Sequence, residues 1–254
     1  MSWFTDLGST YHQIYFLTAF MVGLFCFYMM ILVFQRYIQR KTIITMKLGF
    51  DLLFLGIALF LDPVFLFMRA AWDIDYVGLQ GVLSFGFTGY ANIFLILFLV
   101  EVFYKNQTTL FAKILILFEA LVLPIGVYFY YTNQDTLPLL LIHLLASFII
   151  YLTQFHQGIR LRRKLNTETP QDKVSINGFT FIGVAGLLQF LTFVSFIMQE
   201  LSMFLGDLYI QWGLMQEGAS IFIPIGFFLA GVAAFVLYLG FIMPDWIKRR
   251  WQVK

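Results

Sequence analysis

Seven long apolar segments take up almost the whole of this 254-residue chain. A helix needs about 20 apolar residues to cross a hydrocarbon core of roughly 30 Å, and each segment is long enough. A water-soluble surface cannot be built from a chain that is 61% hydrophobic and 12% charged, with a mean hydropathy of +0.84. The sequence therefore predicts an all-α membrane protein, a bundle of seven transmembrane helices. The predicted spans cover residues 14–35, 47–69, 81–104, 109–131, 137–157, 177–204 and 214–243 of one domain, 1–254, without a soluble domain.

The basic residues lie almost entirely on one side of these segments. Of the sixteen lysines and arginines, only Arg69 falls on the other side. Lysine and arginine accumulate in the cytoplasmic loops of membrane proteins. We therefore expect the N-terminus outside and the C-terminus in the cytoplasm. We expect the protein to lie in the plasma membrane. The first segment has no basic stretch before it, so we expect an uncleaved anchor.

Two basic clusters on the predicted cytoplasmic side are candidates for contact with anionic lipid or with a cytoplasmic partner. The first follows the fifth span and the second follows the seventh. They consist of Arg160, Arg162, Arg163 and Lys164, and of Lys248, Arg249 and Arg250. The alternative is that they only set the topology.

The second span carries ionisable residues at membrane depth, where a charge is costly and usually has a partner or a function. Asp51, Asp62 and Arg69 recur at spacings that return to one face of a helix. Asp62 precedes Pro63, which frees a backbone carbonyl one turn earlier. Two interpretations stay open: a structural ion pair between Asp62 and Arg69, or a ligand or proton site at Asp62.

Other spans carry polar residues as well. Glu119 lies near the middle of the fourth span without a basic residue within one turn, so it must be protonated or receive a hydrogen bond from another helix. Glu101 and Lys105 have the spacing of a local ion pair. The polar stripes of the third and fifth spans are Ser84, Thr88 and Asn92, and His143, Ser147, Tyr151 and Gln154.

Six polar residues on five spans fall between the middle of the membrane and its outer surface. They are Asp62, Asn92, His143, Gln189, Glu200 and Glu217. One interpretation is a ligand or proton site assembled from several helices, with Pro224 kinking the seventh span nearby. The other is a set of unrelated interhelical hydrogen bonds, because a sequence does not give the rotation of each helix.

Motifs for metals and cofactors are missing from the sequence. His12 and His156 belong to opposite membrane faces, and Cys26 is the only cysteine, so no metal site is expected. A retinal pigment needs a lysine in the last span, and the nearest is Lys248. The third span ends in Glu101-Val102-Phe103 instead of the Glu/Asp-Arg-Tyr of common G-protein-coupled receptors. We therefore expect no cofactor and no nucleic-acid partner.

The junction after the seventh span reads Tyr-Leu-Gly-Phe-Ile-Met-Pro-Asp-Trp-Ile-Lys-Arg-Arg from Tyr238 to Arg250. It resembles the exit of the seven-span sensor regions of prokaryotic histidine kinases and related signalling proteins, where a Pro-x-Trp-Leu-Arg-like segment leads into the output module. The sequence departs from that pattern at Lys254, its last residue. The resemblance therefore implies a sensor whose output passes through a separate partner.

We expect a non-enzymatic sensor or receptor-like protein that responds to a small molecule or lipid. A small transporter or proton-coupled carrier that uses Asp62, Glu119 and Glu200 is the alternative. An intramembrane enzyme or a structural subunit of a membrane complex stays open too.

Overall fold

The computed structural model describes residues 10–72, 77–104, 108–132, 134, 136–165, 170–204, 215–216 and 219–242. These residues contain seven helices that are long and apolar enough to cross a membrane, which confirms the predicted fold class. The chain is an integral membrane protein. The helices are α2 (Thr10–Arg40), α3 (Ile43–Trp72), α4 (Val77–Tyr104), α5 (Leu110–Tyr131), α6 (Leu137–Lys164), α7 (Pro170–Phe204) and α9 (Phe222–Ile242). Two short strands between α7 and α9 pair antiparallel: β1 (Met215–Gln216) and β2 (Ala219–Ser220).

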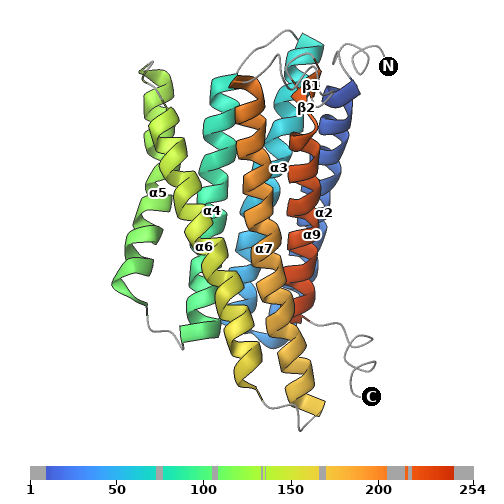
Figure 1. Cartoon of the computed structure of the whole chain (residues 1–254), viewed down its shortest axis with the longest axis vertical. Coiled ribbons are helices and arrows are strands. Elements are labelled where there is room, and N and C mark those ends of the chain that lie inside the picture. The colour runs from blue at the N-terminus through green and yellow to red at the C-terminus, as the bar shows by residue number, and fades with distance from the viewer. Residues whose placement is uncertain are drawn as a thin grey trace.

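Six helices form a closed ring in the order α2, α3, α4, α6, α7 and α9, and α9 returns to pack against α2. Helix α5 lies outside this ring, against α4 and α6 (Figure 1). Its outward side chains are large and apolar, as a lipid-facing surface requires: Leu110, Phe111, Ile114, Leu117 and Leu121 are all exposed. Successive helices run in opposite directions, so α2 begins at the upper end of the bundle in Figure 1 and α9 ends at the lower end.

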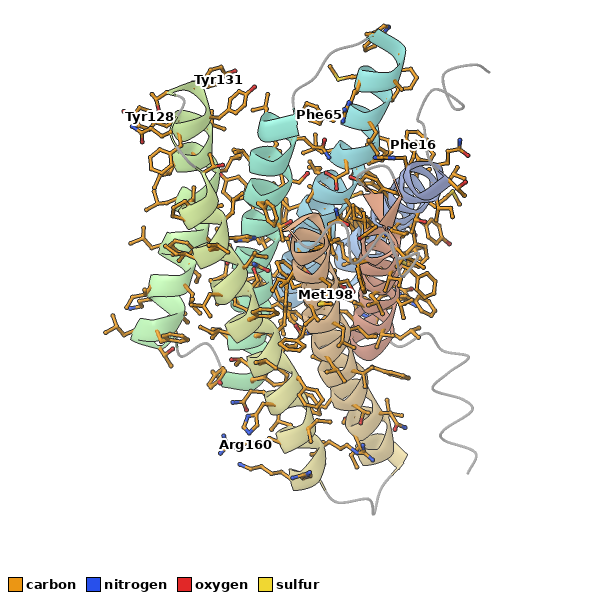
Figure 2. The ribbon with its side chains drawn as sticks, turned by 45° about the horizontal axis from the view of Figure 1, so that its top comes forward. Phe16, Phe65, Tyr128, Tyr131, Arg160 and Met198 are labelled. Atoms are coloured by element: carbon orange, nitrogen blue, oxygen red, sulfur yellow. The ribbon has the colours of Figure 1, made fainter. Side chains whose placement is uncertain are left out.

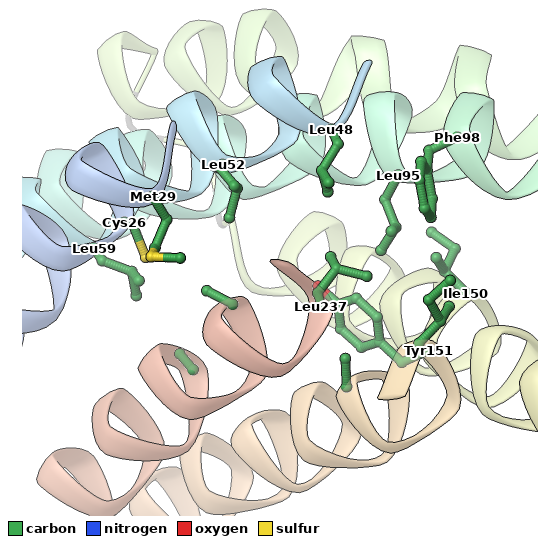
Figure 3. Packing of buried hydrophobic residues seen from close by; sticks show 14 of the residues in the cluster. Cys26, Met29, Leu48, Leu52, Leu59, Leu95, Phe98, Ile150, Tyr151 and Leu237 are labelled. Carbon is green, nitrogen blue, oxygen red and sulfur yellow. The ribbon is translucent and has the colours of Figure 1, made fainter. Parts of the chain in front are cut away.

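The centre of the ring is a continuous apolar core. Leu48 and Leu52 of α3, Phe98 of α4 and Leu237 of α9 are completely buried there (Figure 3). Cys26 of α2 also lies in this cluster. These residues lie between the upper and lower ends of the bundle.

Helix α9 begins later than the sequence predicted, at Phe222 instead of 214. The preceding residues pair as the β1–β2 hairpin and are therefore not helical. Pro224 thus falls in the first turn of α9, where its missing N–H has no intrahelical partner to lose. The predicted kink at Pro224 is wrong for this reason, and Glu217 lies outside the described residues.

The first basic cluster lies at the lower end of α6, where Arg160, Arg162, Arg163 and Lys164 are all exposed. Figure 2 shows Arg160 at this end. The second cluster, Lys248, Arg249 and Arg250, lies outside the described residues. The orientation of the bundle in the membrane stays a prediction.

A single introduced cysteine tests that orientation. In a Cys26→Ala background, Arg163→Cys at the lower end should react with a membrane-impermeant maleimide only after the cells are permeabilised, because basic residues remain in the cytoplasm. Trp72→Cys is the matched control, since Trp72 is 61% exposed at the upper end of α3. It should react in intact cells. The reverse pattern of labelling would invert the topology.

Candidate functional site

A cavity of about 220 Å³ lies among α2, α3, α4, α7 and α9 in the upper half of the bundle. We call it the upper cavity. Its polar lining comes from four helices, α2, α3, α4 and α7. These residues are Tyr15, Asp62, Gln80, Ser84, Thr88, Thr192 and Gln199. The remaining wall is mainly aromatic and aliphatic, which is the usual composition of a site for a small molecule.

Asp62 is the only carboxylate among the described lining residues of the upper cavity. Its Oδ1 accepts hydrogen bonds from Gln80 Nε2 at 3.0 Å and from Ser84 Oγ at 2.8 Å. The Tyr15 hydroxyl also lies beside this carboxylate. Neutral donors from α2 and α4 therefore hold the Asp62 side chain in place.

The predicted ion pair between Asp62 and Arg69 is wrong. Arg69 is exposed near the upper end of α3, and the ion pairs among the described residues lie elsewhere. Seven positions along a helix correspond to about 10 Å of axial rise, so two side chains on one stripe need not meet. Gln80 and Ser84 on α4 are the hydrogen-bond partners of Asp62 instead.

Aromatic rings form a connected wall of the upper cavity. Tyr15 packs against Phe227 with ring centroids 5.4 Å apart, and Phe227 packs against Phe196 at 5.6 Å. Phe196 in turn meets Phe193 at 6.2 Å. The wall therefore runs from α2 through α9 to α7, and all four rings line the cavity.

A second polar group lies among α4, α5 and α6, and we call it the Glu119 cluster. Its members are Asn92, Glu119, His143, Ser147 and Tyr151. Asn92 Nδ2 donates to Glu119 Oε1 at 3.1 Å and to Ser147 Oγ at 2.9 Å. Tyr151 donates to Asn92 Oδ1 at 2.9 Å, and His143 Nδ1 lies 2.7 Å from Glu119 Oε2.

The Glu119 cluster confirms that other helices supply hydrogen-bonding partners to Glu119. Glu119 and His143 are both completely buried. The cluster joins the peripheral helix α5 to the ring through polar contacts, which is a common role of such groups within membranes. Gly89 leaves the space that Glu119 needs, because a Cβ atom at Gly89 would lie 3.0 Å from Glu119 Oε2.

Two aromatic rings separate the upper cavity from the Glu119 cluster. Phe85 and Phe193 line the cavity, and their centroids lie 5.7 and 6.3 Å from that of the His143 ring. Phe193 also contacts Tyr151, with centroids 5.3 Å apart. His143 Nε2 has no hydrogen-bond partner among the described residues. A ligand that moves Phe85 or Phe193 would therefore also disturb the packing around His143.

The six predicted site residues do not form one site in the described part of the chain. Asp62 lines the upper cavity, whereas Asn92 and His143 belong to the Glu119 cluster. Gln189 is buried, and its Oε1 has no partner among the described residues. It does not line the upper cavity. The side chain of Glu200 and the whole of Glu217 lie outside the described part of the chain.

Gln80, which donates a hydrogen bond to Asp62, was not among the predicted site residues. Its signal was present, since Gln80 precedes Ser84 by four positions and extends the polar stripe of α4 by one turn. The aromatic wall had no comparable signal, because phenylalanine is abundant along the whole chain, with 32 residues.

A second cavity, the lower cavity, lies at the opposite end of the bundle and measures about 480 Å³. The same five helices line it, from Arg40 of α2 to Ile242 of α9. Glu101 lines it too and forms an ion pair with Lys47 of α3. Lys105, its predicted local partner, lies outside the described residues.

Metal-binding groups are absent from the described residues, in which no three histidine, cysteine, aspartate or glutamate side chains gather around one point. Comparisons of the chain with models of protein families, with curated proteins and with solved structures find no match.

Proposed function

We propose that this integral membrane protein is a non-enzymatic sensor that binds a small ligand in the upper cavity and changes the shape of the lower cavity. The observation that carries the proposal is that α2, α3, α4, α7 and α9 line both cavities. A ligand that shifts these helices at one end repositions them at the other, because helices are rigid along their axes and packed cores have discrete arrangements.

The core between the two cavities supports sensing over conduction. Leu48, Leu52 and Leu237 are 0% exposed, so water does not reach these three side chains in the described structure. A signal can pass through such a layer as helix movement, whereas a solute cannot pass without opening it. The separate partner that reads the lower cavity would be a cytoplasmic protein, for which the exposed cluster from Arg160 to Lys164 offers positive charge.

Two spin labels across the lower cavity test this function. In the Cys26→Ala background, Ile38→Cys on α2 and Ser175→Cys on α7 place labels at exposed positions of two helices that line the cavity. Ala58→Phe mimics an occupant, because Ala58 is buried and lines the upper cavity. We expect it to change the distribution of distances between the labels, measured by electron–electron double resonance.

The matched control is Leu117→Phe, which adds a ring to the lipid-facing surface of α5, where Leu117 is 63% exposed. It should leave the distribution unchanged. Small molecules whose binding is lost in Ala58→Phe but retained in Leu117→Phe occupy the upper cavity, and they should cause the same change as Ala58→Phe. If neither Ala58→Phe nor a bound small molecule changes the distances between the labels, the sensor function is contradicted.

A proton-coupled carrier is the second function that an observation favours. Asp51 is buried in α3, about three helical turns below Asp62. Its Oδ2 has no hydrogen-bond partner among the described residues. Buried carboxylates at successive depths are typical of proton-coupled transport. A carrier in proteoliposomes would accumulate a labelled upper-cavity ligand under a pH gradient and would lose this ability in Asp51→Asn. A sensor would bind the ligand without net flux.

A further inference from the structure

We infer that the ligand of the upper cavity is a small organic cation, a protonated amine with a compact apolar body, whose ammonium group pairs with Asp62. This inference rests on the proposed function in placing the ligand in that cavity. It adds the chemical class of the ligand.

The charge of the cavity lining favours a cation. Asp62 faces the upper cavity without a lysine, arginine or histidine among the described lining residues. Gln80 and Ser84 orient its Oδ1 but supply no positive charge. Asp62 is half-buried at membrane depth, where a carboxylate without a counter-charge is costly, and a ligand that brings the counter-charge lowers that cost. An anionic ligand would add to the cost instead.

The hydroxyl groups of the lining donate their protons to the protein itself. Thr88 donates its proton to Ser84 O at 2.8 Å, and Thr192 donates to Leu188 O at 3.0 Å. Ser84 donates to Asp62. These three hydroxyls have therefore used their donors within the protein, and their oxygen lone pairs remain as acceptors. Hydroxyl oxygens that present acceptors favour a ligand with N–H donors, such as an ammonium group.

The aromatic wall also favours a cation. A cation within about 6 Å of the centroid of an aromatic ring is attracted by its negative face. Tyr15 lies both beside Asp62 and in contact with Phe227, so a cation paired with Asp62 also lies close to aromatic rings. Phe193 and Phe196 extend this wall for the apolar part of the ligand.

The size of the upper cavity limits the ligand to a small molecule. The upper cavity holds about 220 Å³, below the 300–1,000 Å³ or so of sites for drug-sized ligands. This volume excludes a whole membrane lipid and favours an amine with one ring or a short branched chain.

Benzylamine and benzyl alcohol form the test pair, because they share one ring and differ in the charged group. Binding to the purified full-length protein in lipid nanodiscs is measured by titration calorimetry and by the shift in melting temperature. We expect the amine to bind at least about tenfold more tightly than the alcohol. Asp62→Asn should weaken amine binding about 100-fold, a typical loss for one partner of a buried charge pair, and leave the alcohol unaffected.

The matched control is Asp51→Asn, which neutralises a buried carboxylate on the same helix that does not line the upper cavity. It should not change amine affinity. Should Asp62→Asn fail to fold, the comparison of amine with alcohol on the unaltered protein still decides, and Ala58→Phe should exclude both.

Three results would overturn the inference: equal affinity for amine and alcohol, amine affinity that survives Asp62→Asn, or no binding of benzylamine or cyclohexylamine at millimolar concentration. The failure of the sensor is a different result. If amine binding depends on Asp62 but the distances between the spin labels at the lower cavity do not change, the sensor function is contradicted and the amine ligand is supported. If only neutral molecules bind, if Ala58→Phe abolishes their binding, and if they change the distances at the lower cavity, the sensor function is supported and the amine ligand is contradicted.

Discussion

Replacement of Gly158 by leucine should prevent α6 and α7 from packing and should destabilise the bundle by at least about 3 kcal/mol, the upper end of the usual cost of overpacking. A Cβ atom at Gly158 would lie 2.6 Å from Gly183 Cα and 2.8 Å from Phe179 O. Both contacts are with backbone atoms, so no change of rotamer relieves them. The two helices would have to separate, and the hydrogen bond from Gln154 to Ile182 O would be lost with them.

The melting temperature and the yield of monodisperse protein in detergent measure this effect. Gly81→Ala is the control, because a Cβ atom at Gly81 meets nothing within 4 Å. Replacing glycine by alanine within a helix should stabilise it by about 0.5–1 kcal/mol. A Gly158→Leu protein that melts like the unaltered protein would show that α6 and α7 do not approach each other as closely as described.

Replacement of Glu119 by leucine should lower the free energy of unfolding by about 3 kcal/mol, since it leaves a buried group without its partner. His143 Nδ1 would lose its contact, and Asn92 would keep only Ser147 as the acceptor for its amide protons. A single interhelical hydrogen bond in a membrane contributes only about 0.6 kcal/mol, so a loss near that value would identify ordinary packing contacts instead.

Glu119→Gln is the conservative control for this prediction. It keeps a side-chain oxygen for the Asn92 amide, and we expect it to cost less than about 1 kcal/mol. The double variant Glu119→Leu with His143→Leu removes both buried partners and should recover part of the stability lost by the single variant. Additive losses in the double variant, measured by thermal or denaturant unfolding, would contradict a coupled pair.

The helices were predictable because their cause is local. A bilayer forces each spanning segment to satisfy its own backbone hydrogen bonds, so about 20 apolar residues are enough to predict a helix. The predicted start of α9 was wrong because the residues before α9 do not follow this local rule. The hairpin at Met215–Gln216 and Ala219–Ser220 depends on pairing between strands and on contacts with α2, which hydropathy does not report.

The candidate site was predictable only in part. The need of Glu119 for a partner on another helix follows from its depth in the membrane and from the absence of nearby basic residues. That the partners are Asn92 and His143 does not follow, since it depends on where α4 and α6 lie relative to α5. The stripe through Asp62 and Arg69 suggested a pair that the structure does not contain, because Gln80 and Ser84 are closer.

The sequence by itself determined that the chain crosses a membrane with seven helices, and it determined which faces of α3, α4 and α6 are polar. Both properties depend on the order of residues within one helix. The tertiary structure alone decided that α5 leaves the ring, that Asp62 meets an aromatic wall, and that five helices line a cavity at each end. The physical reason is that the rotation of a helix and its choice of neighbours depend on contacts between side chains that are far apart in the chain.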